Sequence, residues 1–434
     1  NVLIGYRAGY TGTSPDGSIG IGYRALYNNT ANYSVAIGYD AGFAITSGTG
    51  NVFVGAFTGD SITTGDSNTA LGYAALSAED TGTRNVAIGN EALKVLNYDG
   101  AGYNVAVGHR AGYALTTGTV NTFIGAFAGG ATDDGTRNVV LGYAAMDTGN
   151  AGDDNIAIGY GALQDTTASG NIAIGSYAMI QHTTGTRNIA IGTNAMQDTD
   201  AGSTSLGSVD NIFMGHNAGG GTWTDVASNQ NVAIGNYAMD SALDGAIRNV
   251  AIGHEALSGV TGADYNQAIG YRALYTANTG GQNIAIGHEA ALNITSGGQN
   301  VAIGYHAGYN NQTGVYNVHI GTQAGYGAAS NSANTNTFVG YKAGYDVSTG
   351  YNNVAVGGGA LENVTTGYDN VVVGNYAGDA ITTTNFVTLI GRNAGGAINS
   401  TDANGTVAIG YQAGLTLTDG QYNTLVGYQA GDGL

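Results

Sequence analysis

The sequence contains no cysteine and only one proline, Pro15, among its 434 residues. A disulfide framework and a thiolate metal site are therefore excluded. Only 9 % of the residues are charged and 43 % are hydrophobic, which excludes a disordered chain. Collagen is excluded as well, because the 76 glycines follow no Gly-X-Y period and almost no proline accompanies them.

Basic residues are scarce, with 11 Lys and Arg against 30 Asp and Glu, so the net charge is −19. This balance argues against nucleic acid and anionic membranes as partners. No apolar run approaches ~20 residues, so we expect no membrane insertion, and no signal peptide is visible. Asn1 already lies inside a repeat, so we expect the sequence to be part of something longer.

The dominant feature of the sequence is a repeat, usually of 17 residues. A glycine preceded by an apolar pair occurs in 25 copies that cover the whole chain, and positions are counted below from this glycine. For example, "NIAIGHEA" at 283–290 returns as "NVAIGYHA" at 300–307. No domain boundary is visible, so we predict one continuous repeat domain over 1–434. Two longer copies predict enlarged loops over 197–231.

Each position of the repeat has its own chemistry. Position −1 is always aliphatic or Met, position −3 is nearly always Val, Ile or Thr, Asn stands at −4 in 21 copies, and Ala stands at +3 in 24. This period of two predicts a strand from −3 to −1. A single coil cannot bury its apolar face, so the coils must stack. The sequence predicts an all-β parallel β-solenoid (β-roll) of about 25 coils, each with a strand, a glycine bend, a second short strand and a Thr/Gly turn.

Stacking turns each position into a column along the solenoid. We expect the −3 and −1 columns to fill the core, the repeat glycine to adopt a conformation that other residues resist, and the Asn column to form a ladder. Position −2 is also apolar, and we predict that it packs against sister chains. The candidate contacts in this homo-oligomer are Phe53, Phe123, Phe213 and Phe338.

The pattern "NVAIGYxAG…TTGxxN" resembles two groups of proteins. One is the head repeats of trimeric autotransporter adhesins. The other, closer in repeat length and in "IGYQAG", is the repetitive shaft of phage-type tail-fibre proteins. Asn at −4, Ile or Val at −1, the glycine and Ala at +3 carry the resemblance in all 25 copies, although the coil is longer than in the adhesins. The resemblance implies a left-handed homotrimer that is extracellular or on a virion surface.

Residues with catalytic potential are few. Lys94 and Lys342 lie in no phosphate-loop pattern, and no serine stands in a nucleophile elbow, so we predict no enzyme and no cofactor. His254 and His288 share position +1 two coils apart, roughly 9.6 Å, which is too far for two ligands of one zinc ion. His319, at position −2, is the histidine best placed to bind a metal ion at a symmetry axis. The alternative is that it is simply accommodated by the fold and binds no metal.

Two acidic pairs, Asp133–Asp134 and Asp153–Asp154, stand in turns, where calcium sites often occur. They lack the spacing of calcium-binding β-rolls. The sequence therefore favours solvated turn carboxylates over calcium.

Aromatic residues suggest where a ligand could bind. Position +1 is Tyr in 11 copies, including Tyr271, Tyr305 and Tyr341, and it is His in four. Such a track could stack on sugar rings, or it could simply stiffen the edge of the coils. Trp223, in the enlarged loops, is a second candidate for glycan contact. The alternative is that these loops only interrupt the repeat and have no binding role.

The sequence predicts a non-enzymatic structural fibre that acts as a rigid extracellular rod or shaft. The first alternative is a surface adhesin that binds cell-surface glycans through the tyrosine track or Trp223. The second is an ice-binding solenoid that uses threonine columns, although variable turn lengths weaken that interpretation.

Overall fold

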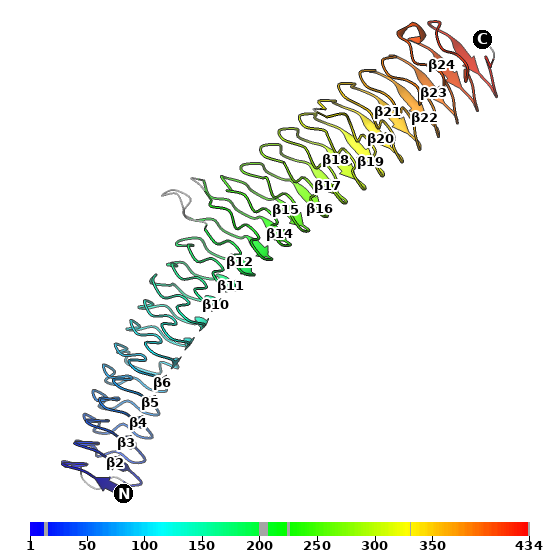
Figure 1. The fold of residues 1–434 in the computed structure, drawn as a ribbon. Helices are drawn as coiled ribbons and strands as arrows, with labels where there is room; N and C mark the ends of the chain where they lie inside the picture. Colours follow the sequence, from blue (N-terminus) through cyan, green and yellow to red (C-terminus); the bar gives the residue numbers. More distant parts are fainter. Residues whose placement is uncertain (13–15, 199–206, 224–225, 330, 433–434) are drawn as a thin grey trace. The chain divides into compact units, whose positions relative to one another are not determined.

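The computed structural model describes residues 1–12, 16–198, 207–223, 226–329 and 331–432. These residues form a parallel β-solenoid in which each repeat contributes one three-residue strand (Figure 1). They form two compact units, Asn1–Asn211 with Thr222–Ala227, and Ile212–Gly221 with Ser228–Leu434. The division falls within the predicted enlarged loops 197–231, of which 199–206 and 224–225 lie outside the described residues. The single domain over 1–434 stays a prediction.

The strands of the first unit are β1 (Val2–Ile4), β2 (Ile19–Ile21), β3 (Val35–Ile37), β4 (Val52–Val54), β5 (Thr69–Leu71), β6 (Val86–Ile88), β7 (Val105–Val107), β8 (Thr122–Ile124), β9 (Val139–Leu141), β10 (Ile156–Ile158), β11 (Ile172–Ile174) and β12 (Ile189–Ile191). Those of the second unit are β13 (Ile212–Met214), β14 (Val232–Ile234), β15 (Val250–Ile252), β16 (Gln267–Ile269), β17 (Ile284–Ile286), β18 (Val301–Ile303), β19 (Val318–Ile320), β20 (Thr337–Val339), β21 (Val354–Val356), β22 (Val371–Val373), β23 (Thr388–Ile390), β24 (Val407–Ile409) and β25 (Thr424–Val426). A 3₁₀ turn, η1, spans Thr401–Ala403.

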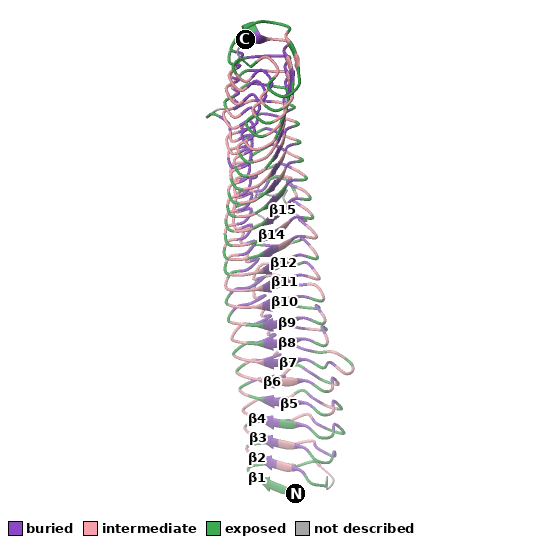
Figure 2. Ribbon diagram, turned by 90° about the vertical axis from the view of Figure 1, so that its right-hand side faces the viewer, coloured by how far each residue is buried: buried purple, intermediate pink, exposed green. Residues whose placement is uncertain are grey.

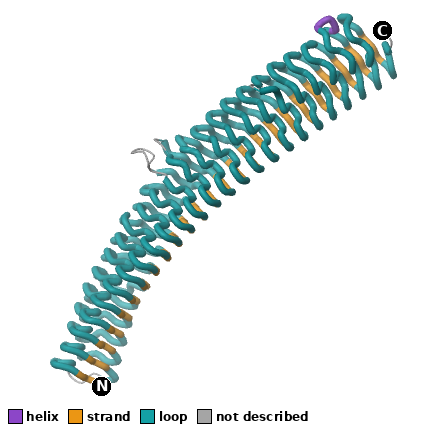
Figure 3. The backbone as a smooth tube through the Cα atoms, in the orientation of Figure 1, coloured by secondary structure: helices purple, strands orange, loops and turns teal. Residues whose placement is uncertain are grey.

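Within each unit every strand pairs in parallel with the next, residue for residue. Between β17 and β18, Ala285 pairs with Ala302 and Ile286 with Ile303. The strands line one side of the stack and turns make up the rest of each coil (Figure 3). The predicted stacking of equal positions into columns is therefore confirmed.

The predicted second strand is wrong. After the repeat glycine the chain turns repeatedly, because positions +2 and +4 have positive φ, as at Glu289 (φ 52) and Ala291 (φ 52). A residue in the left-handed region bends the chain away from an extended path. A coil therefore closes through tight turns, with one strand instead of two.

The repeat glycine has the special conformation that its invariance predicts. Gly287 has φ +139, and a Cβ on it would overlap the backbone carbonyl of Gly304 in the next coil. Only glycine accommodates both the positive φ and this approach. The stacking distance thus depends on a residue without a side chain.

The buried Asn column forms the predicted ladder. Asn283 donates from Nδ2 to the carbonyl of Gly297, 2.9 Å away, in the turn that ends its coil. Its Oδ1 accepts the backbone N–H of Asn300 at 3.0 Å. One side chain therefore closes its own coil and positions the next one, and the amide is fully shielded from water.

The prediction of which strand face is buried is wrong. Ala285, at −2, is 0 % exposed, whereas Ile286, at −1, is 37 % exposed. In each strand from β2 to β24 the central residue is buried and the two flanking residues are partly or fully exposed (Figure 2). The four phenylalanines predicted to contact sister chains all lie in the interior of their own chain, fully buried: Phe53, Phe123, Phe213 and Phe338.

The narrow interior is filled by complementary volumes at −2 and +4. In the coil with Phe53 at position −2, position +4 is Gly59. A Cβ atom added to Gly59 would lie 2.7 Å from the Phe53 ring. Where −2 is Ala70, position +4 is Leu76, and both are fully buried. In coils of these two kinds one large side chain lies across the interior, supplied from either position.

In the part of the chain that the structure describes, no helix has the length and apolarity needed to cross a membrane.

We predict that Phe53→Ala lowers the free energy of unfolding by about 3–5 kcal/mol, because it empties the interior opposite Gly59. Adding Gly59→Leu should recover part of that loss, since Leu76 occupies the same position with φ 53. Denaturant unfolding of both variants measures the two effects. A double variant less stable than the single one would contradict complementary packing.

Candidate functional site

One candidate interaction surface is the outward side of the strands, formed by positions −3 and −1 and here called the outer apolar face. None of its residues is charged, and in no strand is either position fully buried. Its members include Leu71 (47 % exposed), Leu141 (44 %) and Ile390 (39 %). Continuous exposed apolar surfaces of this kind mark interaction sites in soluble proteins.

The +1 column lies beside this face and contains runs of stacked aromatic rings, separated by coils with no ring at +1. The His288 ring lies between those of Tyr271 and Tyr305, with centroid distances of 4.9 and 5.2 Å. Stacking covers the ring faces and leaves mainly edges and hydroxyls exposed. Tyr271 and Tyr305 are thus exposed, as a binding role requires, but their faces are largely occupied by neighbouring rings.

Tyr341 differs from the two other predicted tyrosines. Its neighbours in the +1 column are Thr322 and Gly358, which carry no ring, and it is 55 % exposed. Lys342 Nζ lies 5.7 Å from its centroid. Of the three, Tyr341 is the best placed to offer a ring face to a sugar.

Trp223 is fully buried, which contradicts its predicted role as an exposed contact. Its backbone N–H donates to the carbonyl of Asp198 at 2.9 Å. The indole fills space in the interior because an apolar side chain of this size gains most by leaving water.

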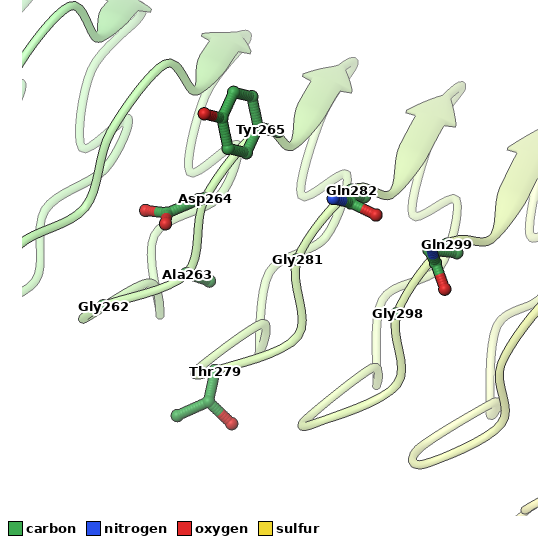
Figure 4. A pocket seen from close by; sticks show the side chains of 9 residues that line it. All are labelled: Gly262, Ala263, Asp264, Tyr265, Thr279, Gly281, Gln282, Gly298 and Gln299. Atoms are coloured by element: carbon green, nitrogen blue, oxygen red, sulfur yellow. The ribbon is translucent and has the colours of Figure 1, made fainter.

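A shallow hollow of about 400 Å³ lies between turns of the second unit (Figure 4). It exists because glycines such as Gly281 and Gly298 carry no side chain, while Asp264, Tyr265 and Gln282 form its rim. The Tyr265 hydroxyl accepts a hydrogen bond from Arg248 at 2.6 Å, and Asp264 accepts the N–H of Ile247 at 2.9 Å. A polar, open rim can contact a hydrophilic ligand but does not enclose one.

His319, the histidine predicted to face a symmetry axis, lies inside its own coil. It is buried and stacks on Phe338 with centroids 5.4 Å apart. Burial lowers its pKa to about 4. It cannot meet copies of itself, and it occupies −2 in the way the phenylalanines do.

The acidic pairs bind neighbouring side chains. Arg137 Nε lies 2.6 Å from Asp154, and Arg137 Nη2 lies 3.2 Å from Asp153. Asp134 accepts a hydrogen bond from Asn150 at 3.3 Å. In Asp153–Asp154 the guanidinium thus occupies the position that a cation would need.

The turn threonines form ladders of their own. Thr295 Oγ1 donates to the carbonyl of Gln312 at 3.1 Å, and Thr365 Oγ1 donates to that of Thr382 at 3.1 Å. These hydroxyl groups therefore already donate their hydrogen bonds to the next coil. Ice binding through these columns stays a prediction, with weaker support.

One cluster of potential metal ligands is not predicted from the sequence. His288, Glu289 and His306 bring three potential metal-ligand atoms within 4.8 Å of one another. His306 Nε2 lies 2.8 Å from Glu289 Oε2, and burial lowers the His306 pKa more than the carboxylate raises it. The signal was available in the sequence, because positions +1 and +2 of one coil adjoin position +2 of the next.

We predict that neutral His319 stabilises the protein above pH 6.5 and that this contribution, about 3 kcal/mol, is lost as the pH falls toward 4. Over that interval the unfolded chain binds a proton that the folded chain does not. His319→Phe, which repeats the side chain of Phe338 in the next coil, should remove this dependence. Unfolding of both proteins between pH 4 and 7 gives the difference curve, and a flat curve would contradict the burial of a neutral imidazole.

Comparison with known proteins gives no relative from which a function could be transferred. No protein-family model matches the chain, and neither does any curated protein or solved structure. The function must therefore be argued from the repeat residues and the surfaces that they form.

Proposed function

We propose that this protein is a non-enzymatic structural fibre protein, an extracellular or virion-surface spacer similar to a tail-fibre shaft. The observation that carries the proposal is the uniform register of the coils within each unit, in which every strand pairs over all three residues with the next. Backbone ladders, the Asn column and the filled interior give a stack that resists bending and proteolysis.

The partner that we propose is further copies of the same chain. The outer apolar face offers two positions in each of the twelve strands of the first unit and the thirteen of the second. A stable interface needs roughly 20–30 residues a side, so either unit could supply one. The face is uncharged in a protein of net charge −19 and repeats with the coil, so identical chains can match along their length. A trimer follows from the resemblance to tail-fibre shafts and adhesin heads.

We expect the intact protein to sediment as a trimer and Ile286→Glu with Ile303→Glu to weaken assembly by several kcal/mol, because like charges then meet across the interface. Both side chains point outward, so circular dichroism should still show the β-fold. Gln282→Glu with Gln299→Glu, which adds the same charge in the turns, is the matched control. A monomeric wild type, or assembly unaffected by the first pair, would contradict self-association through this face.

Glycan binding is the second candidate function, and the open ring of Tyr341 favours it. It would make the fibre an adhesin in addition to a spacer. The hollow beside Tyr265, with its carboxylate and amide rim, offers hydrogen bonds of the kind that sugars use.

For this candidate we predict that Tyr341→Ala reduces binding on a glycan array about tenfold, the equivalent of ~1.4 kcal/mol, whereas Tyr271→Ala has little effect because neighbouring rings already cover its faces. Equal losses in both variants would instead implicate the whole track. If the wild-type protein binds no glycan, the adhesin function is contradicted and only the spacer function remains.

A further inference from the structure

The cluster of His288, Glu289 and His306 joins two adjacent coils of the second unit. His288 and Glu289 follow β17, and His306 follows β18. Strict pairing of β17 with β18 places Glu289 and His306 at the same position in neighbouring coils. The backbone N–H of His306 donates to the carbonyl of His288 at 3.0 Å, so the main chain fixes the spacing.

The three polar atoms are close to the arrangement that a metal ion requires. Glu289 Oε2 lies 2.8 Å from His306 Nε2 and 3.9 Å from His288 Nδ1. Ligand atoms about 2.0–2.1 Å from a tetrahedral zinc ion are about 3.3 Å from one another. Small side-chain rotations would therefore bring all three atoms to coordination distance.

Neighbouring aromatic rings hold both imidazoles in place. His288 is stacked between Tyr271 and Tyr305, and His306 packs against Tyr305 and Tyr309 with centroids 3.8 and 4.8 Å apart. His306 Nε2 is shielded from water, and the group that faces it is Glu289 Oε2, 2.8 Å away. A metal ion bound to both atoms would take the place of this contact and satisfy the buried nitrogen.

The same chain contains a matched constellation with one difference. His254 and Glu255 stand two coils earlier at the positions of His288 and Glu289, but the residue facing them is Arg272 instead of a histidine. Arg272 forms an ion pair with Glu255 and also packs over Tyr271 and Tyr275. A bound guanidinium there supplies the positive charge, and an arginine cannot act as a metal ligand at neutral pH.

We propose that His288, Glu289 and His306 bind one divalent transition-metal ion of the zinc class, with water completing the coordination, and that the ion joins two neighbouring coils. Two imidazoles and one carboxylate form a ligand set that suits zinc, with an open fourth position. The site is independent of the spacer function, because it needs only one chain and two coils.

Zinc titration of the full chain against a chromogenic chelator tests the site. The wild type should bind one Zn²⁺ per chain, and His306→Arg should weaken binding about 100-fold or more through loss of a ligand. This variant copies the native Glu255–Arg272 pair, so it should fold. Arg272→His should create a second site with His254 and Glu255 and raise the stoichiometry to two.

Cobalt substitution supplies a readout that does not depend on affinity alone. Co²⁺ in the wild type should give the intense visible absorption of a four-coordinate ion, and His306→Arg should abolish it. The proposal is overturned if the wild type binds no stoichiometric Zn²⁺. It is equally overturned if binding and the cobalt spectrum survive in His306→Arg.

Discussion

The buried asparagine of most repeats is the constraint on which the rest of the structure depends. Its side chain spans from the start of the strand to the turn that ends the coil, as Asn68 does to Gly82 over 2.8 Å. A side chain of fixed length sets how far apart these two segments lie. Where serine replaces it, the contact is longer, 3.3 Å from Ser18 to Ala31 and 3.4 Å from Ser34 to Gly48.

A coil closed in this way has a narrow interior, and its other features follow. In many coils one large side chain lies across it, as where Phe53 faces a glycine and Ala70 faces a leucine. The residues at −3 and −1, most of them β-branched, point away from this interior and form the outer apolar face. The exposed apolar surface thus accompanies closure of the coil, and it is the surface through which we propose that identical chains associate.

Much of this fold could be predicted from the sequence, because columns of identical residues demand stacking. The coil length, the parallel strands, the glycine conformation and the Asn ladder follow from residue type and spacing. Which strand face points inward could not be decided from alternation, since both faces are apolar. The exchange of large and small residues between −2 and +4, as in Phe53 with Gly59, carried that information. The left-handed residues at +2, such as Glu289, have no signature in residue type, so the second strand was predicted in error.

The candidate sites, too, could be predicted from the sequence only in part. Spacing within the +1 column predicts that His254 and His288 lie apart, but the contact of Glu289 with His306 involves the adjacent +2 column. Trp223 is predicted as an exposed ligand contact because it lies in the enlarged loops, but its burial gives it a packing role. Residue type indicated where chemistry was available, whereas only the path of the chain decided which groups meet.

Amide hydrogen exchange tests the central claim most directly. In Asn266→Ala, the N–H of Asn283 loses its acceptor at 3.0 Å, and the carbonyl of Gly280 loses its donor at 3.0 Å. Each unpaired buried group costs about 1–3 kcal/mol, so exchange at Asn283 should accelerate about tenfold or more. The equivalent amide of Asn353, in a distant coil, should exchange as in the wild type. Unchanged exchange at Asn283 would contradict coil closure by the asparagine ladder.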